Sequence, residues 1–274
     1  MHSPTLLEKK WTLNLAGRVF VVNVGSNAAH RFCSPIFQDR TFEFIPIPED
    51  RFIPQPNGVL YGDLHSFYDP SKNLNSYIPE RFLKETTHND PEFDTFTYGD
   101  NCDVNPRAMS LRNVERGDFL MFLARLNHWV PEGGTDAYGF FLVGYLHVDH
   151  IINSVTNIPL SVDLERFSSN AHIRRAMYDS SLWDSFWVFG GSSWSRRFHK
   201  AVPVTREICD QVFRAADGSK WKWEMKENGR SDLQIIGSYT RTCRCLIDPG
   251  TEEGAERARL LWKWIELYSD KSPD

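Results

Sequence analysis

The chain has 274 residues, of which 41% are hydrophobic and 24% charged; this composition excludes a disordered or coiled-coil protein and is sufficient for a buried core. The formal net charge of −5 gives the chain no overall attraction to DNA, RNA or anionic lipid, so any contact with a polyanion has to be local. Aromatic residues make up 14% of the chain, and most of them are expected in the core.

Cysteine usage and hydropathy predict the compartment. The five cysteines are irregularly spaced and include no CxxC pair for zinc or redox chemistry. The N-terminal segment is charged rather than apolar like a signal peptide, and no window reaches the roughly 18 apolar residues of a membrane span. The sequence therefore predicts a soluble, cytoplasmic protein that makes no membrane contact.

Two short β-rich runs begin the predicted fold. Residues Arg18–Val24 form an apolar run that ends at a Gly-Ser-Asn turn, which predicts a strand. Residues Phe42–Ile45 predict a second short strand, at a sheet edge because Pro46 and Pro48 cannot donate ladder hydrogen bonds. Residues 50–86 contain several Pro and Gly and are expected to form an irregular insertion.

The clearest pattern lies in the middle of the chain. Two apolar, aromatic-rich runs, Phe119–Leu126 and Tyr138–Ile152, flank the turn-forming sequence PEGGTD. This arrangement predicts an antiparallel pair buried on both faces. Three further strand candidates follow, in the sequences SFWVFGG, KAVPVT and LQIIGSYTRTCRCLI.

The last predicted element is a helix over Thr251–Tyr268. Thr251 is a suitable N-cap, and one apolar stripe, with Trp262 outside it, is formed by Leu260, Leu261, Trp264, Ile265 and Tyr268. The elements together predict an α+β fold built on a PUA-like curled antiparallel sheet or small β-barrel, with flanking helices and a C-terminal helix. We expect one domain over 1–274, with a central part at 17–200 and C-terminal strands and helix at 201–274.

The sequence THNDPEFDTFTYGD, residues 87–100, combines a histidine, acids and aromatic residues. A hard cation is one way to hold such acids together, although the spacing matches no EF-hand loop, and we assign no metal ligand and no cofactor. Acid–base catalysis is a second interpretation, with His88, Asp90 and Asp100 as candidate catalytic residues. The third interpretation is structural, with acids that cap turns and aromatic side chains that anchor the loop.

A second group of polar residues suits a nucleotide. Glycines and serines after a predicted strand offer N–H groups and hydroxyls to a phosphate, beside two arginines, and an indole ring offers base stacking worth roughly 1–3 kcal/mol. The alternative is a strand-ending loop with a solvated basic face and with capping residues before it, and no Walker or GxGxxG motif is present. The candidate nucleotide-binding residues are Tyr98, Asn170, His172, Gly191, Ser192, Ser193, Trp194, Arg196 and Arg197.

Several segments together resemble a known family. SPIFQDRTFEFIPIPE, THNDPEFDTFTYGD, RGDFLMFLARL, YGFFLVGYLHVDHI, NAH and FGGSSWS resemble, in that order, the third group of the nucleotide-modification-associated domains of phages, bacteria and archaea. The resemblance covers about Gly17 to Lys200 and implies an association with DNA or nucleotide modification and with conflict between phage and host. The matching positions are His88, Asp90, Tyr98, Gly99, Asp100, Gly117, Asp118, Asn170, His172, Gly191 and Ser193.

A looser likeness is to the PUA-like barrels, which include the EVE, ASCH and YTH domains. It is carried by the Gly-Asp turn, the strand after it and the VGY strand. These barrels read single, often modified nucleotides in an aromatic pocket, so the likeness implies a similar use for the tryptophans.

The function expected from these observations is binding of a nucleotide or base, a modified one in DNA, by extrusion of the base into an aromatic pocket. The partner would be DNA or a nucleotide, and no protein partner is indicated. Two alternatives stay open. One is an enzyme acting on a nucleotide or DNA base with a His/Asp acid–base pair, and the other is a non-catalytic interaction module of a defence system.

Overall fold

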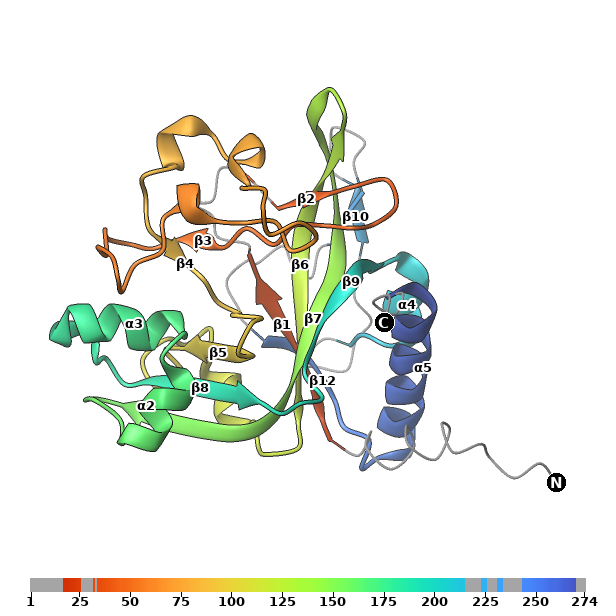
Figure 1. Cartoon of the computed structure of the whole chain (residues 1–274). Coiled ribbons are helices and arrows are strands. Elements are labelled where there is room, and N and C mark those ends of the chain that lie inside the picture. The colour runs from red at the N-terminus through yellow and green to blue at the C-terminus, as the bar shows by residue number, and fades with distance from the viewer. Residues whose placement is uncertain are drawn as a thin grey trace.

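The computed structural model describes residues 17–25, 32, 34–214, 223–225, 231–233 and 243–269. Its centre is a large, mostly antiparallel sheet in which the strands follow the order β12, β1, β6, β7, β8, β5 (Figure 1). These strands are β1 (Val19–Val24), β5 (Thr97–Asp100), β6 (Phe119–Val130), β7 (Gly133–Val155), β8 (Phe186–Gly191) and β12 (Cys243–Ile247). Two more strands join this sheet away from the main order: β2 (Pro35–Ile36) pairs with β6, and β9 (Arg196–Pro203) pairs with β7.

Strand β6 shows why the central sequence is apolar without interruption. Its side chains alternate between two clusters on opposite faces of the sheet, as the period of a strand requires. Phe119, Met121 and Leu123 face one cluster, and the residues between them face the other. Because both faces are covered, the run from Phe119 to Ala124 is buried at every position.

The predicted hairpin in this region is confirmed, and it is longer than the sequence indicated. β6 pairs with β7 in antiparallel register from Phe119↔His147 to Val130↔Gly133. The turn is therefore shorter than PEGGTD, because its glycines already belong to β7. The far half of β7 continues past β6 and pairs with β8.

The sheet has two edges. β5 ends it on one side and β12 on the other, and no pairing in the described part of the chain joins them. The expected mixed fold, with an antiparallel sheet and a C-terminal helix, is confirmed, whereas the closed β-barrel that was the alternative is not formed. The likeness to PUA-like domains is not confirmed.

Four α-helices occur in the described ranges: α2 (Ser161–Phe167), α3 (Ala171–Tyr178), α4 (Arg206–Gln211) and α5 (Glu252–Tyr268). Figure 1 shows α4 and α5 on one side of the sheet, and α2 and α3 beside β5 and β8 at its other end. None of the helices in these ranges is long and apolar enough to cross a membrane.

Helix α5 begins as predicted, with the Thr251 side chain accepting the Gly254 N–H at 3.0 Å. The expectation that Trp262 lies outside the apolar stripe is wrong. Its side chain is 8% exposed, and its ring centroid lies 5.0 Å from that of Phe119. The indole of Trp264 is partly buried at the edge of the same contact and donates to the Pro203 carbonyl at 2.9 Å. The contact face is therefore wider than a narrow stripe, because α5 lies on a broad sheet.

Residues 50–86 are irregular, as their Pro and Gly content indicates, with three short 3-10 turns at Tyr61–Asp63, Asn75–Tyr77 and Glu80–Phe82. The segment contributes Tyr61, Leu74 and Ile78 to a small apolar cluster that also contains Ile45. The strand expected at Phe42–Ile45 is reduced to a single bridge between Phe42 and Ile36. The paired residues come later, where β3 (Ile47–Pro48) is antiparallel to β4 (Thr87–His88).

The remaining strands are β10 (Trp223–Met225) and β11 (Ser231–Leu233), which form an antiparallel pair. The run LQIIGSYTRTCRCLI was predicted as one strand. Its first residue closes β11 and its last five form β12, and the residues between them lie outside the described part.

Candidate functional site

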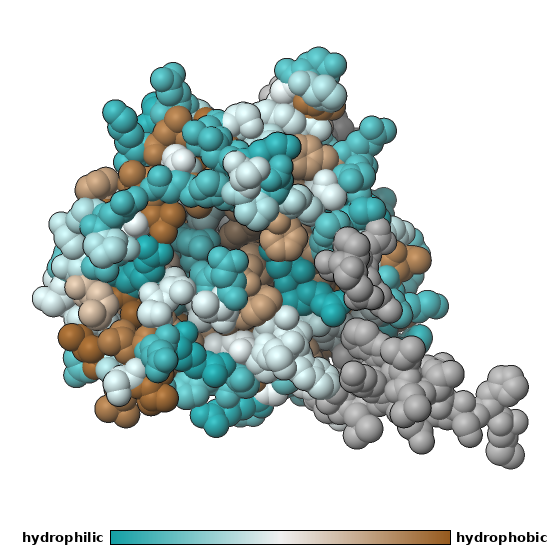
Figure 2. Space-filling model, in the orientation of Figure 1, coloured by the Kyte–Doolittle hydropathy of each residue, from teal (hydrophilic) through white to brown (hydrophobic). Residues whose placement is uncertain are grey.

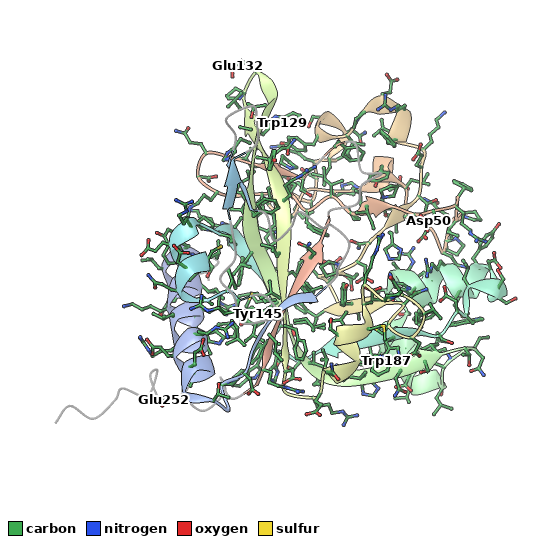
Figure 3. All side chains as sticks on the ribbon, turned by 180° about the vertical axis from the view of Figure 1, so that it is seen from behind. Asp50, Trp129, Glu132, Tyr145, Trp187 and Glu252 are labelled. Carbon is green, nitrogen blue, oxygen red and sulfur yellow. The ribbon has the colours of Figure 1, made fainter. Side chains whose placement is uncertain are left out.

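Residues predicted from distant parts of the sequence converge on one cavity of about 350 Å³, here called the first cavity. Figure 3 labels Asp50 on its lining, in the view from behind. The cavity lies between the end of β1, the β3–β4 pair, β5 and α3. The predicted residues that line it are His88, Asp90, Tyr98, Asp100 and His172.

Gly99 brings these elements together. A Cβ atom at this position would lie 2.6 Å from Cδ2 of His172, so only glycine lets the imidazole pack against β5. The Gly99 N–H donates to Oδ2 of Asp90 at 2.8 Å. One glycine therefore places α3, β5 and the residues after β4 around the same space.

His88 is oriented by a carboxylate. Its Nδ1 lies 2.8 Å from Oε2 of Glu49, and Oε1 of Glu49 accepts from Arg175 at 3.3 Å. Burial opposes ionisation of Glu49, but the His88 hydrogen bond and the Arg175 charge outweigh it and lower the pKa of Glu49. Because Glu49 is then an acceptor only, His88 donates through Nδ1, and in the neutral ring this leaves the lone pair on Nε2. This Nε2 is 4.0 Å from Oδ2 of Asp90.

His172 presents the opposite tautomer. Arg175 approaches its Nδ1 at 3.0 Å, and because a guanidinium has no acceptor, Nδ1 has to accept. The hydrogen is then on Nε2, which lies 3.6 Å from Oδ2 of Asp90. Burial and the positive charge of Arg175 lower the pKa of His172 well below its ordinary value, so the ring is neutral. Asp90 thus lies between Nε2 of His88 and the Nε2–H of His172.

Asp90 is a buried carboxyl group with a vacant oxygen. Burial outweighs the Gly99 hydrogen bond and raises the pKa of Asp90 well above its ordinary value. Its Oδ1 has no hydrogen-bond partner among the described residues, and the same is true of Oδ1 of Asn101 and Nε of Arg175, which also line the first cavity. Buried polar atoms without partners are rare in folded proteins and call for an explanation, which a polar ligand would provide here.

The nitrogen and oxygen atoms that could bind a metal ion here lie at suitable separations, but one of them is in an unsuitable protonation state. The nearest ligand atoms of His88, Asp90 and His172 lie within 4.8 Å of one another. His88 has the carboxylate partner that is typical of a metal ligand. His172, however, offers an N–H rather than a lone pair, because Arg175 occupies its other nitrogen.

Tyr98 and Asp100 brace β5 at the edge of the cavity. The Tyr98 hydroxyl is 3.2 Å from Oδ2 of Asp100, and the Tyr98 side chain is buried, which raises its pKa well above the ordinary value. Asn170 is fully buried and caps α3: its Oδ1 accepts the His172 N–H at 3.0 Å, and its Nδ2 donates to Oγ1 of Thr97 at 3.3 Å. It positions His172 and does not line the cavity.

The predicted Gly-Ser loop lies elsewhere, and its residues line neither the first cavity nor the second cavity described below. The N–H groups of Gly191 and Ser192 donate to carbonyls of Phe96 and His147, both at 2.8 Å. Oγ of Ser192 is 2.7 Å from Nδ1 of His147. These donors are engaged within the protein, so phosphate binding by Gly191, Ser192 and Ser193 stays a prediction without support from the geometry.

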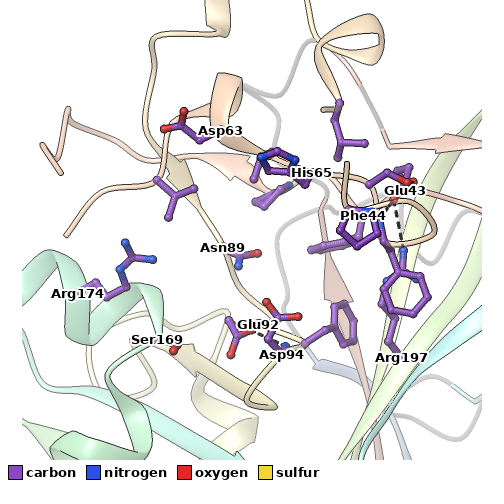
Figure 4. A pocket seen from close by; sticks show the side chains of 18 residues that line it. Glu43, Phe44, Asp63, His65, Asn89, Glu92, Asp94, Ser169, Arg174 and Arg197 are labelled. Carbon is purple, nitrogen blue, oxygen red and sulfur yellow. Dashed lines mark hydrogen bonds and ion pairs between the residues drawn. The ribbon is translucent and has the colours of Figure 1, made fainter. Parts of the chain in front are cut away.

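The remaining candidates separate from one another. Trp194 is 42% exposed, and its ring centroid lies 5.9 Å from that of His147. Arg196 is exposed at the start of β9. The side chain of Arg197 is only 6% exposed and lines a second cavity, which Figure 4 shows from close by. The structure therefore does not bring the predicted arginines and serines to the first cavity, which His88 and His172 line.

Sequence reasoning missed Glu49 and Arg175, which set the tautomers of the two histidines. Nothing local signals Glu49, because it meets His88 only through the β3–β4 pairing. Arg175 could have been found, since positions three apart on a helix share a face, and His172 and Arg175 are so spaced on α3.

Comparison with known proteins finds a family that covers this part of the chain. A family model described as nucleotide modification associated domain 3 matches residues 18–228, which include every residue of the first cavity. No curated protein and no solved structure matches the chain.

Proposed function

Because the chain belongs to the family of nucleotide modification associated domain 3, we propose that the first cavity binds a nucleotide or a base extruded from DNA and catalyses proton transfer on it. The observation that carries the proposal is the arrangement of His88. Its Nδ1 is held by Glu49, and its Nε2 faces Asp90 in the cavity. A base oriented by a carboxylate is the usual form of a general base, which contributes roughly 10²- to 10⁴-fold to a rate.

Asp90 is the partner acid. Its raised pKa favours the protonated carboxyl, and its vacant Oδ1 can donate to a ligand. His88 accepts a proton, Asp90 supplies one, and the Gly99 N–H holds the acid in place through its bond to Oδ2 at 2.8 Å.

The size of the cavity supports a base or nucleoside as the ligand. A volume of about 350 Å³ falls within the range of small-molecule sites, roughly 300–1,000 Å³. Extrusion of a base costs a few kcal/mol, which hydrogen bonds to the vacant polar atoms of Asp90, Asn101 and Arg175 offset. Recognition of a modified base without reaction is the weaker candidate for this cavity, because titratable side chains rather than stacking rings converge here.

The test is a product assay by mass spectrometry. The full chain is incubated with nucleotides and with plain and modified single- and double-stranded oligonucleotides. We expect a mass change with the wild-type protein and its loss with His88→Gln or Asp90→Asn. Asp103→Asn is the matched control, since this carboxylate lies three residues after Asp100 but does not line the cavity. Binding without any mass change would contradict catalysis, and full activity of His88→Gln would remove that residue from the mechanism.

A further inference from the structure

A second cavity of about 530 Å³ lies behind the first, with no residue common to both. Between them runs the segment that contains His88, Asn89 and Asp90, and its side chains line the two cavities in turn. His88 and Asp90 line the first cavity, whereas Asn89 lines the second. This alternation follows from the two-residue period of extended chain. The alternation explains why residues 87–100 combine such different residue types, because this segment faces two cavities.

Phenyl rings form the sides of the second cavity. Phe44 and Phe93 meet edge to face, with ring centroids 5.6 Å apart. Phe67 is 49% exposed, yet its ring is held flat over the Arg197 guanidinium, whose central carbon lies 3.6 Å from the ring centroid. A fixed, exposed phenyl face beside two more rings suits a planar heterocycle. Figure 2 shows the molecular surface hollowed near the middle of the face seen in Figure 1.

Some polar side chains of the second cavity form hydrogen bonds within the protein, and others are available to a ligand. Glu43 accepts from the Ser66 hydroxyl and the Phe67 N–H, and Glu92 accepts from the N–H groups of Asp94 and Thr95. The side chains of Asn89 and Asp94, in contrast, form no hydrogen bond within the described ranges. In Figure 4 both belong to the cavity lining, with Glu92 beside Asp94.

Charge decides the class of ligand. Four carboxylates line the second cavity, those of Glu43, Asp63, Glu92 and Asp94, against the two guanidinium groups of Arg174 and Arg197. Arg197 is already engaged, since it donates to the Phe42 carbonyl at 2.8 Å and lies 3.8 Å from Glu43. A phosphate inside this cavity would meet like charge. A heterocycle with an exocyclic amino group would instead donate to Asp94, while the Asn89 amide pairs with a neighbouring ring atom.

We infer that the second cavity binds a nucleobase that carries an exocyclic amino group, namely adenine, cytosine or guanine, with the phosphate outside. This site is separate from the one that carries the proposed proton transfer, and it does not depend on that reaction. The protein would then contact two bases, one on each side of the segment that contains His88, Asn89 and Asp90.

Titration calorimetry with the full chain tests the inference. The probes are the 5′-monophosphates of adenosine, cytidine, guanosine, uridine and thymidine, with ribose 5-phosphate as the probe for phosphate alone. We expect the amino-bearing bases to bind at least about tenfold more tightly than uracil and thymine, since a hydrogen bond to a charged acceptor contributes roughly that much. Ribose 5-phosphate should not bind. Equal affinity for all five bases, or no binding of any, would overturn the inference.

Two variants locate the site. Asp94→Ala should weaken binding of the amino-bearing bases about tenfold and remove the preference, and Phe67→Ala should weaken all bases. Both side chains lie at the cavity surface, so folding is expected to persist, which circular dichroism checks. Asp103→Asn is the matched control, since this carboxylate lines neither cavity, and it should leave this binding unchanged. If Asp90→Asn weakens it as much as Asp94→Ala does, the base lies in the first cavity and the inference fails, whatever the outcome of the product assay.

Discussion

Asp90 shows how one residue can serve a site at the expense of stability. The folded protein favours its neutral form, so its contribution to stability is present at low pH and is lost as pH rises from the ordinary value of 3.8 through the raised pKa. Asp90→Asn keeps an oxygen for the Gly99 N–H and cannot ionise. We expect this variant to unfold at an equal or higher temperature than the wild type near about pH 8, with a difference that shrinks in acid, while activity falls roughly 100-fold or more.

Calorimetric unfolding across this pH range, together with the product assay, measures both effects. A variant that is less stable than the wild type at every pH would show that the carboxyl is not a buried neutral acid.

His172 makes the opposite contribution. Its pKa is lowered in the folded protein, so its contribution to stability is present above the ordinary value of 6.5 and is lost as pH falls below that value toward the lowered one. We expect the free energy of unfolding to fall in this range in the wild type, and His172→Gln to flatten the fall. His65→Gln removes an exposed histidine and should leave the fall intact. Urea unfolding at several pH values checks this, and an unchanged slope in His172→Gln would contradict the buried neutral ring.

At the scale of elements, a helix, strand or site could be predicted from the sequence where the residues that determine it are close together in the chain. Helix α5 was predicted from its cap and apolar side chains, and the β6–β7 hairpin from two apolar runs around a turn. His88 and Asp90 stood out because they are neighbours in the chain. Their convergence with His172 could not be predicted, because it depends on α3 packing against β5 at Gly99.

The Gly-Ser loop shows the same limit for a polar motif, whose phosphate binding stays a prediction. Its composition suited a phosphate, but Gly191 is a strand residue whose N–H donates to the Phe96 carbonyl. A Cβ at Gly191 would come within 2.2 Å of Oγ of Ser195. A ladder partner that is distant in sequence uses the donors that a local motif seems to offer, and no local pattern reveals it.

Helix α3 gives the prediction at this scale. Asn170 caps it and so positions His172 and Arg175. Asn170→Ala should cost about 1 kcal/mol of unfolding free energy, or somewhat more because the bond to Thr97 is also lost, and should lower activity. Thr251→Ala removes the equivalent cap of α5, on the other side of the sheet, and should cost about the same without loss of activity. Equal effects of the two variants on activity would mean that α3 does not position the site.

At the scale of the whole molecule, the C-terminal elements complete the sheet that carries both cavities. β1 lies between β6 and β12, and the end of β1 lines the first cavity. Helix α5 covers the face of the sheet opposite the cluster that contains Tyr98 and Phe189. The order of the strands therefore predicts that 17–200 and the C-terminal part unfold together as one unit.

Leu261 in α5 provides the test of this unit. It is fully buried in the cluster that includes Met121 and Val19, so Leu261→Ala should cost about 2–5 kcal/mol. If the molecule is one cooperative unit, this loss of stability should speed up hydrogen exchange of the β5 amides beside the first cavity as much as that of the α5 amides. This is expected although α5 and the first cavity lie on different sides of the sheet. Leu267→Ala, at an exposed position of the same helix, is the control and should change neither. Exchange that rises in α5 and β12 alone would mean that the C-terminal part unfolds by itself, in which case the cavities do not depend on it.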